Sequence, residues 1–271
     1  MNKFCMPFKM NKKYNSEIKE FSINYKDNPE QLANFLSFVD NEQRVNIKIT
    51  ELTQEIVDEL ILIKTKDPNT NFALAVMTPS TLLMFKEQLN NAKIPYYIDF
   101  TCDNLSFFLY LTRLEVCDIV IGGDLGFQIK DVSKVAHDNS INVRVRCNIA
   151  QFILNEEPTI DNIVSFFIRP EDMDTYAEYV DTFEFFDPES KSYNLDTIYE
   201  IYAKDKKWSG LLSEIIWNYI DDTDNYYLVP NFVDRRLNCG KRCALGKCKL
   251  CYELNNLAKT MKEKQIVIKA T

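Results

Sequence analysis

Histidine is nearly absent from this sequence, and its scarcity argues against several kinds of chemistry. The chain has one histidine, His137, in a segment that we predict to be the end of a helix. Metal sites with two or three histidines need more of them, and a serine–histidine pair would require this single ring. We expect His137 to be solvated or packed, and neither chemistry to operate here.

The chain also has no net positive charge and no long apolar runs. The formal net charge is −8, which argues against a general nucleic-acid binder whose affinity comes from neutralising phosphates. No stretch approaches the roughly 18 apolar residues that cross a bilayer. The N-terminal segment MNKFCMPFKMNKKY has no apolar core of the signal-peptide kind. We therefore expect a cytoplasmic protein with no membrane association.

Short β-branched and aromatic runs alternate with longer segments of helical spacing, which is typical of parallel βα units. Eight strands are predicted, at 21–25, 44–49, 72–77, 96–100, 118–122, 141–148, 164–169 and 182–186. A chain of 271 residues, 46% of them hydrophobic, can bury one large core. We predict a main domain at 1–207 and a C-terminal extension at 208–271.

Eight such units could form an open doubly wound sheet or a closed barrel. In the strand predicted at 141–148, apolar and polar residues alternate, whereas a strand of an open parallel sheet is apolar on both faces. We therefore predict an α/β fold, a (β/α)8 barrel of the TIM type, distorted where Pro158 interrupts the crossover after the sixth strand. The same alternation places five polar residues on the inner face of the barrel: Asn24, Lys48, Asp99, Arg169 and Glu184.

Polar side chains inside a barrel, near the C-terminal ends of its strands, indicate a site for an anionic small molecule. The candidate substrate-binding residues are Lys48, Arg146, Asn148 and Arg169. The candidates for proton transfer are Asp99, Asp124 and Glu184. Asp124 belongs to a glycine-rich loop, IGGDLGF, for which a plain turn is the alternative. The alternative for the whole set is an internal ion-pair network of arginines with Asp99 and Glu184, kept for packing alone.

Four of the eight cysteines are crowded near the C-terminus, at Cys239, Cys243, Cys248 and Cys251. Four thiolates in one short segment can bind a metal centre, and the neighbouring lysines and arginines would offset their charge. Structural zinc sites usually pair two close Cys-x-x-Cys knuckles, and only one is present here. Crowded cysteines also bind iron–sulfur clusters, so spacing alone leaves both a [4Fe–4S] cluster and zinc open.

Three segments resemble the collagenase-like peptidase family: DIVIGGDLGFQIKDVSKVAHDNSINVRV, FFIRPEDMDTYAEYVDTFEFF and NCGKRCALGKC. The resemblance covers residues 115–190 and 236–251. It implies a barrel fold, and several relatives carry a four-iron cluster and hydroxylate RNA bases or the ubiquinone ring without oxygen. By this resemblance Arg169, Glu184 and Asp124 match family positions. Where the family has a His-Gly and two cysteines, this chain reads FEFFDPESKSYNL.

Together these observations favour an iron–sulfur barrel enzyme that carries out a redox modification of a small anionic or RNA-linked substrate. The alternative is a non-catalytic scaffold with a structural zinc tail, whose aromatic stretch 208–232 would contact a protein partner. A metal-dependent peptidase is the weakest alternative, because four cysteine ligands normally leave zinc no open position.

Overall fold

The computed structural model describes residues 3–8, 13–25, 29–40, 42–100, 102, 105–121, 129–147, 168–185 and 195–205. The chain divides into two compact units. The first comprises Met1–Ile121, Val135–Arg144 and Val180–Phe185. The second comprises Gly122–Lys134, Val145–Tyr179 and Phe186–Thr271. The boundary predicted at 207/208 falls outside the described residues and stays a prediction.

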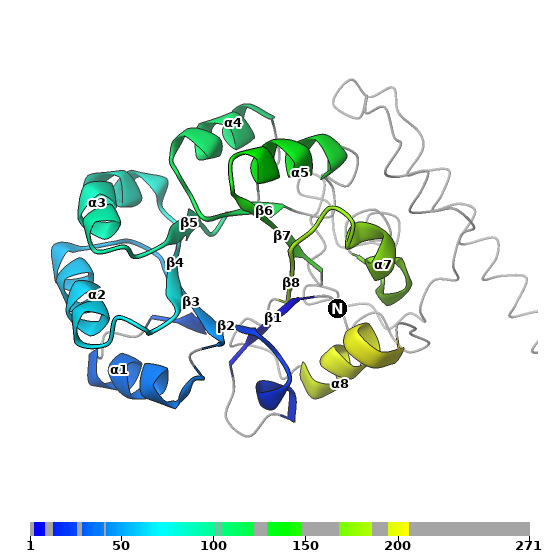
Figure 1. Cartoon of the computed structure of the whole chain (residues 1–271), viewed down its shortest axis with the longest axis horizontal. Coiled ribbons are helices and arrows are strands. Elements are labelled where there is room, and N and C mark those ends of the chain that lie inside the picture. Colours follow the sequence, from blue (N-terminus) through cyan, green and yellow to red (C-terminus); the bar gives the residue numbers. More distant parts are fainter. Residues whose placement is uncertain are drawn as a thin grey trace, which may run out of the picture. The chain divides into compact units, whose positions relative to one another are not determined.

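Eight parallel strands make one sheet that closes almost into a ring (Figure 1), which confirms the predicted α/β barrel of the TIM type. The strands are β1 (Phe4–Pro7), β2 (Glu20–Asn24), β3 (Arg44–Ile49), β4 (Phe72–Val76), β5 (Tyr96–Ile98), β6 (Asp118–Ile121), β7 (Asn142–Arg146) and β8 (Thr182–Glu184). Their spatial order is β5-β4-β3-β2-β1-β8-β7-β6. The two end strands meet where the amide of Cys117 donates to the carbonyl of Tyr96, at 2.9 Å.

Four helices of the first unit lie outside the ring of strands (Figure 1). They are α1 (Pro29–Phe38), α2 (Gln54–Lys66), α3 (Pro79–Asn91) and α4 (Leu105–Arg113). Helix α3 begins at a proline, where the missing amide costs no hydrogen bond. It buries Leu82, Phe85 and Leu89, a spacing that places all three on one face of a helix.

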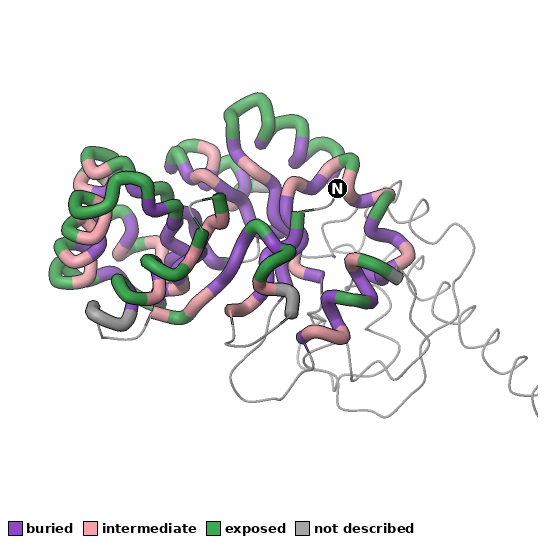
Figure 2. The backbone as a smooth tube through the Cα atoms, turned by 60° about the horizontal axis from the view of Figure 1, so that its bottom comes forward, coloured by how far each residue is buried: buried purple, intermediate pink, exposed green. Residues whose placement is uncertain are grey.

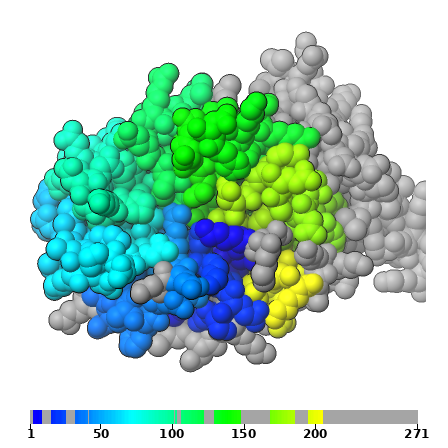
Figure 3. All heavy atoms as spheres, viewed as in Figure 1, coloured from blue at the N-terminus to red at the C-terminus, as the bar shows by residue number. Residues whose placement is uncertain are grey.

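The core lies between the strands and these helices. All five residues of β4 are buried, and the tube in Figure 2 shows buried strands and helices with exposed outer faces. In the space-filling view, atoms fill the centre of the ring on the visible face (Figure 3). On this face the ring of strands has no open pore at its centre.

The set of strands differs from the sequence prediction at two places. The first strand, β1, was missed because Phe4–Pro7 is short and ends in proline, but it pairs in parallel with both β2 and β8. The strand predicted at 164–169 lies mostly outside the described residues, and Ile168 and Arg169 at its end are not in a strand. The described residues form a sheet of eight strands, the number predicted, and β1 is one of them.

The described part of the second unit includes the end of β7 and several helical segments. It contains the one-turn 3-10 helix η3 (Pro170–Asp172), α7 (Met173–Tyr176), α8 (Leu195–Glu200) and the π-helical turn η4 (Ile201–Asp205). The hydroxyl of Tyr202 donates to the carbonyl of Ile168 at 2.8 Å. Helix α5 (Ile129–Asp138) has residues in both units, and η1 (Lys13–Ser16) belongs to the first. Among all the described residues, no helix has the length and apolarity to cross a membrane.

The N-terminus of α2 provides a test of the local structure. The Thr53 hydroxyl accepts a hydrogen bond from the Ile56 amide, whereas Thr78, at the same position before α3, makes no such bond. We expect Thr53→Ala to lower the free energy of unfolding by about 1 kcal/mol, because an amide of the first turn loses its acceptor. Thr78→Ala should change it much less. Urea unfolding measures both, and equal losses would contradict the assignment of the cap.

Candidate active site in the barrel lumen

Alternation along the strands directs one set of side chains into the lumen of the first unit. Residues paired across parallel strands point to the same side, and the pairs Cys5↔Glu20 and Glu20↔Arg44 define one such row. A second row runs from Lys48 through Ala75 to Tyr97. The lumen is therefore lined by polar and charged residues at two levels, one near each end of the strands.

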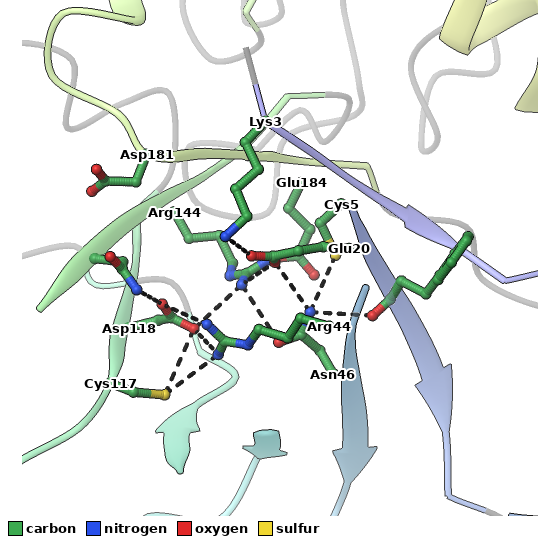
Figure 4. A network of polar contacts seen from close by, with 12 residues as sticks. Lys3, Cys5, Glu20, Arg44, Asn46, Cys117, Asp118, Arg144, Asp181 and Glu184 are labelled. Carbon is green, nitrogen blue, oxygen red and sulfur yellow. Dashed lines mark hydrogen bonds and ion pairs between the residues drawn. The ribbon is translucent and has the colours of Figure 1, made fainter. Parts of the chain in front are cut away.

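The level at the N-terminal ends of the strands is a buried ion-pair network, which we call the basal layer and define as Lys3, Glu20, Arg44, Asp118 and Arg144 (Figure 4). Glu20, Arg44 and Asp118 are each the first residue of their strand. The Nη2 atom of Arg144 lies 2.7 Å from Glu20 Oε2 and 3.3 Å from Asp118 Oδ2. Arg44 also pairs with Asp118, and Lys3 with Glu20.

Neutral groups complete the basal layer. The amide of Asn46 donates to Glu20 Oε2 at 3.2 Å, and that of Asn142 donates to Asp118 Oδ1 at 2.9 Å. The Cys117 thiol lies 3.4 Å from Arg44 Nη2. Each carboxylate thus has two cationic partners and an amide, as buried charges require, whereas Nε of Arg44 and Nε and Nη1 of Arg144 have no partner among the described residues.

Burial and charge act in opposite directions on the pKa values of this layer. Burial favours the neutral acid of Asp118, but the guanidinium groups of Arg144 and Arg44 outweigh it and lower its pKa to about 2. The pKa of Glu20 is lowered in the same way, burial being outweighed by Arg144, Arg44 and Lys3. Both carboxyls are therefore ionised at neutral pH.

A second charged group lies at the C-terminal ends of the strands, and we call Lys48, Asp99 and Glu184 the mouth group. The Lys48 ammonium is 2.7 Å from Glu184 Oε1 and 3.7 Å from Asp99 Oδ2. Lys48 is the penultimate residue of β3, Asp99 follows β5, and Glu184 ends β8. The Glu184 side chain is fully buried, whereas that of Lys48 is 11% exposed. This is the end of the barrel where enzymes of this fold hold their catalytic groups.

The structure thus brings together three of the residues predicted from the sequence: Lys48, Asp99 and Glu184. Arg169 is buried in the second unit, where its Nε and Nη2 atoms contact both carboxylate oxygens of Asp172, at 2.6 and 2.9 Å. Arg146 ends β7. The remaining predicted site residues lie outside the described residues: Asp124, Asn148, Cys239, Cys243, Cys248 and Cys251.

Within the described ranges, no group of three or more histidine, cysteine or acidic side chains could hold a metal ion. Cys5 and Cys117 in those ranges are free thiols. Burial raises the pKa of the Cys5 thiol to about 12, with Arg144 acting against it, so this sulfur is neutral at pH 7. A cluster at the four C-terminal cysteines stays a prediction.

Sequence reasoning missed most of the basal layer, namely Lys3, Glu20, Arg44 and Asp118. Arg44 and Asn46 share the face of Lys48 by simple alternation, so the strand RVNIKI alone could have revealed them. Glu20 and Asp118 stand at the first positions of their strands, where a charged residue usually indicates a solvated boundary. Their inward direction became visible only through the register of the closed sheet.

No protein-family model matches this chain, and no curated protein matches it. Among solved structures, a U32 peptidase, of the collagenase-like class, is similar over 70% of this chain and 94% of its own, with 10% identity and a TM-score of 0.44. A glycerol uptake operon antiterminator-related protein from Thermotoga maritima is similar over 68% of this chain and 94% of its own, with 12% identity and a TM-score of 0.41. Both similarities concern the fold alone.

The depressed pKa of Asp118 makes a prediction about acid stability. Its ordinary pKa is 3.8 and its folded value about 2, so the ionised form stabilises the fold above about pH 4. This stabilisation, about 2 kcal/mol, is lost as the pH falls from about 4 to about 2. We expect the free energy of unfolding, measured in urea, to fall across this window, and to fall less steeply in Asp118→Asn. Equal slopes would contradict the assignment.

Proposed function

We propose that the chain is a barrel enzyme that binds a small anionic substrate at the mouth group and transfers protons there. The observation that carries this proposal is the buried contact of the Lys48 ammonium with two carboxylates, Glu184 and Asp99, at the C-terminal end of the barrel. Lys48 and Glu184 are 136 residues apart in sequence, so the fold itself assembles the group.

The chemistry of the mouth group suits proton transfer. A carboxylate such as Glu184 or Asp99 can accept a proton from a substrate, and the adjacent ammonium can stabilise the negative charge that develops on an oxygen. Such charge stabilisation is strongest where water is excluded, as around a fully buried Glu184 side chain. In this proposal Lys48 orients the anionic group, and the two carboxylates exchange the proton.

The basal layer has a different task. Its charges are mutually paired at the N-terminal ends of the strands, the end of such barrels that is associated with stability and not with catalysis. The lumen therefore has an ion-pair network at one end, built on Glu20 and Asp118 and not on the Asp99 and Glu184 expected from the sequence, and the mouth group at the other.

We further propose that the reaction is a redox modification supported by a [4Fe–4S] cluster at Cys239, Cys243, Cys248 and Cys251. Four thiolates are a complete ligand set for such a cluster, and the resemblance to the collagenase-like family supports iron over zinc. When bound, the cluster would supply or accept electrons, and the barrel residues would bind the substrate and move its protons.

The cofactor is tested by the iron, zinc and labile sulfide content of anaerobically purified full-length protein. We expect about four iron atoms and four sulfides per chain, with a visible absorption band. The variant Cys243→Ser/Cys248→Ser should lose both. Iron unchanged in the variant, or one zinc per chain in place of iron, would overturn the cluster and favour the scaffold with a structural zinc tail and a partner at 208–232.

The mouth group is tested by calorimetric titration of the full chain with inorganic phosphate at constant ionic strength. We expect Lys48→Met to weaken binding at least about tenfold, because a hydrogen bond to a charged group contributes about 1.5–3 kcal/mol. The control Lys19→Met removes an exposed lysine that pairs with Glu42 on the surface, and it should bind phosphate as the natural chain does.

Folding is controlled separately, because Lys48→Met removes a cation that contacts the buried Glu184 carboxylate. The double variant Lys48→Met/Glu184→Gln removes both charges and should recover most of the lost stability while still failing to bind phosphate. Phosphate affinity equal to that of the natural chain in this folded double variant would overturn the assignment of the mouth as the anion site.

A further inference from the structure

Tyr97, which the mouth group does not include, carries a buried polar group without a partner. Its side chain is fully buried on the inner face of β5, and its hydroxyl has no hydrogen-bond partner among the described residues. In the row Lys48–Ala75–Tyr97, the middle residue has no polar side-chain atom. The Lys48 ammonium and the Tyr97 hydroxyl thus belong to the two ends of one inner-face row, and the side chain between them offers no hydrogen-bond acceptor.

Arg144 adds two more donors of the same kind. Its Nη2 atom makes all of its described hydrogen bonds, to Glu20, Asn46 and Asp118. Its Nε and Nη1 atoms are buried and have no partner in the described part of the chain. The Arg144 Cζ lies 5.2 Å from the centroid of the Tyr97 ring, so the guanidinium and the phenol are neighbours inside the lumen.

These groups share one requirement. Buried hydrogen-bond donors almost always have an acceptor. A buried donor without one has lost its hydrogen bonds to water and has gained none from the protein. A guanidinium can only donate. Tyr97 also stays a donor, because burial raises the pKa of its hydroxyl well above its ordinary value, although Arg144 acts against this. The group that would satisfy both residues is therefore an oxygen with lone pairs and negative charge.

We infer that Tyr97 and Arg144 bind a carboxylate or phosphate oxygen of the substrate at the floor of the lumen. This inference rests on the proposed function and deepens it, because it gives the anion a second contact besides Lys48. The register pairs Lys48 with Ala75 and Ala75 with Tyr97, so the tyrosine belongs to the same inner-face row as the Lys48 of the mouth group. The substrate then carries its oxyanion inward, and the atoms that exchange protons lie next to Glu184 and Asp99.

The test changes Tyr97 and leaves Arg144, because Arg144 also holds the basal layer together. Tyr97→Phe removes only the hydroxyl. Since this hydroxyl has no partner in the described protein, the thermal unfolding midpoint of the ligand-free variant should equal that of the natural chain or exceed it. Binding of acetate and of inorganic phosphate, measured by calorimetry against chloride at equal ionic strength, should weaken about tenfold.

The neighbouring Tyr96→Phe is the matched control. The Tyr96 hydroxyl donates to the carbonyl of Leu114 at 3.2 Å, so its removal should lower the unfolding midpoint and leave anion binding unchanged. The expected result is therefore a crossed pattern: one variant loses binding without stability, and the other loses stability without binding.

Three results would overturn the inference. Unchanged acetate and phosphate binding in Tyr97→Phe would show that water satisfies these donors. A clear fall in the unfolding midpoint of Tyr97→Phe would show that the hydroxyl has a structural role. Absence of binding of both anions to the natural chain would remove the ligand. If Lys48→Met weakens phosphate binding and Tyr97→Phe does not, the inference fails while the proposed function stands.

Discussion

The contact of Arg144 with Glu20 and Asp118 is the constraint on which the inside of this barrel depends. Three charges from β7, β2 and β6 are taken out of water, and each costs several kcal/mol of hydration unless its partners are in place. Arg44 adds positive charge from β3, and Lys3 adds it from the residue that precedes β1. The network is therefore satisfied only when the sheet curls far enough to bring non-neighbouring strands together, so it favours a closed ring over an open sheet.

This basal layer also determines what the rest of the lumen can do. Because its carboxylates take up only the Nη2 atom of Arg144, the Nε and Nη1 atoms of that guanidinium have no partner among the described residues. The Arg144 Cζ lies 5.2 Å from the centroid of the Tyr97 ring. The mouth group lies toward the C-terminal ends of the strands. Arg144 thus pairs with the basal-layer carboxylates through Nη2 and keeps two donors unused. In the inferred site these donors link the basal layer to the mouth group.

How far the sequence predicts this arrangement depends on the range of the interactions involved. Strand and helix positions follow from local periodicity, and so does the inward direction of Lys48, Asp99 and Glu184. β1 has no such signal, because Phe4–Pro7 is too short to show alternation and is held by pairing with β2 and β8. Which cation meets which carboxylate depends on register and closure: Lys48, which the sequence did not indicate as their partner, contacts Glu184 and Asp99, and Arg169 pairs with Asp172, three residues away.

The solvent exposure of the side chains distinguishes a packed ion network from a candidate reaction site better than residue type does. Both levels of the lumen contain lysine or arginine with aspartate and glutamate. In the basal layer, the side chains of Arg144, Glu20 and Asp118 are each at most 1% exposed, and the arginine forms ion pairs with both carboxylates. At the mouth group, the Lys48 side chain is 11% exposed and its ammonium contacts the fully buried Glu184 carboxylate. Under the proposed function, a substrate that enters from the C-terminal ends of the strands contacts Lys48, and the donors of Tyr97 and Arg144 bind its oxyanion further inside the lumen.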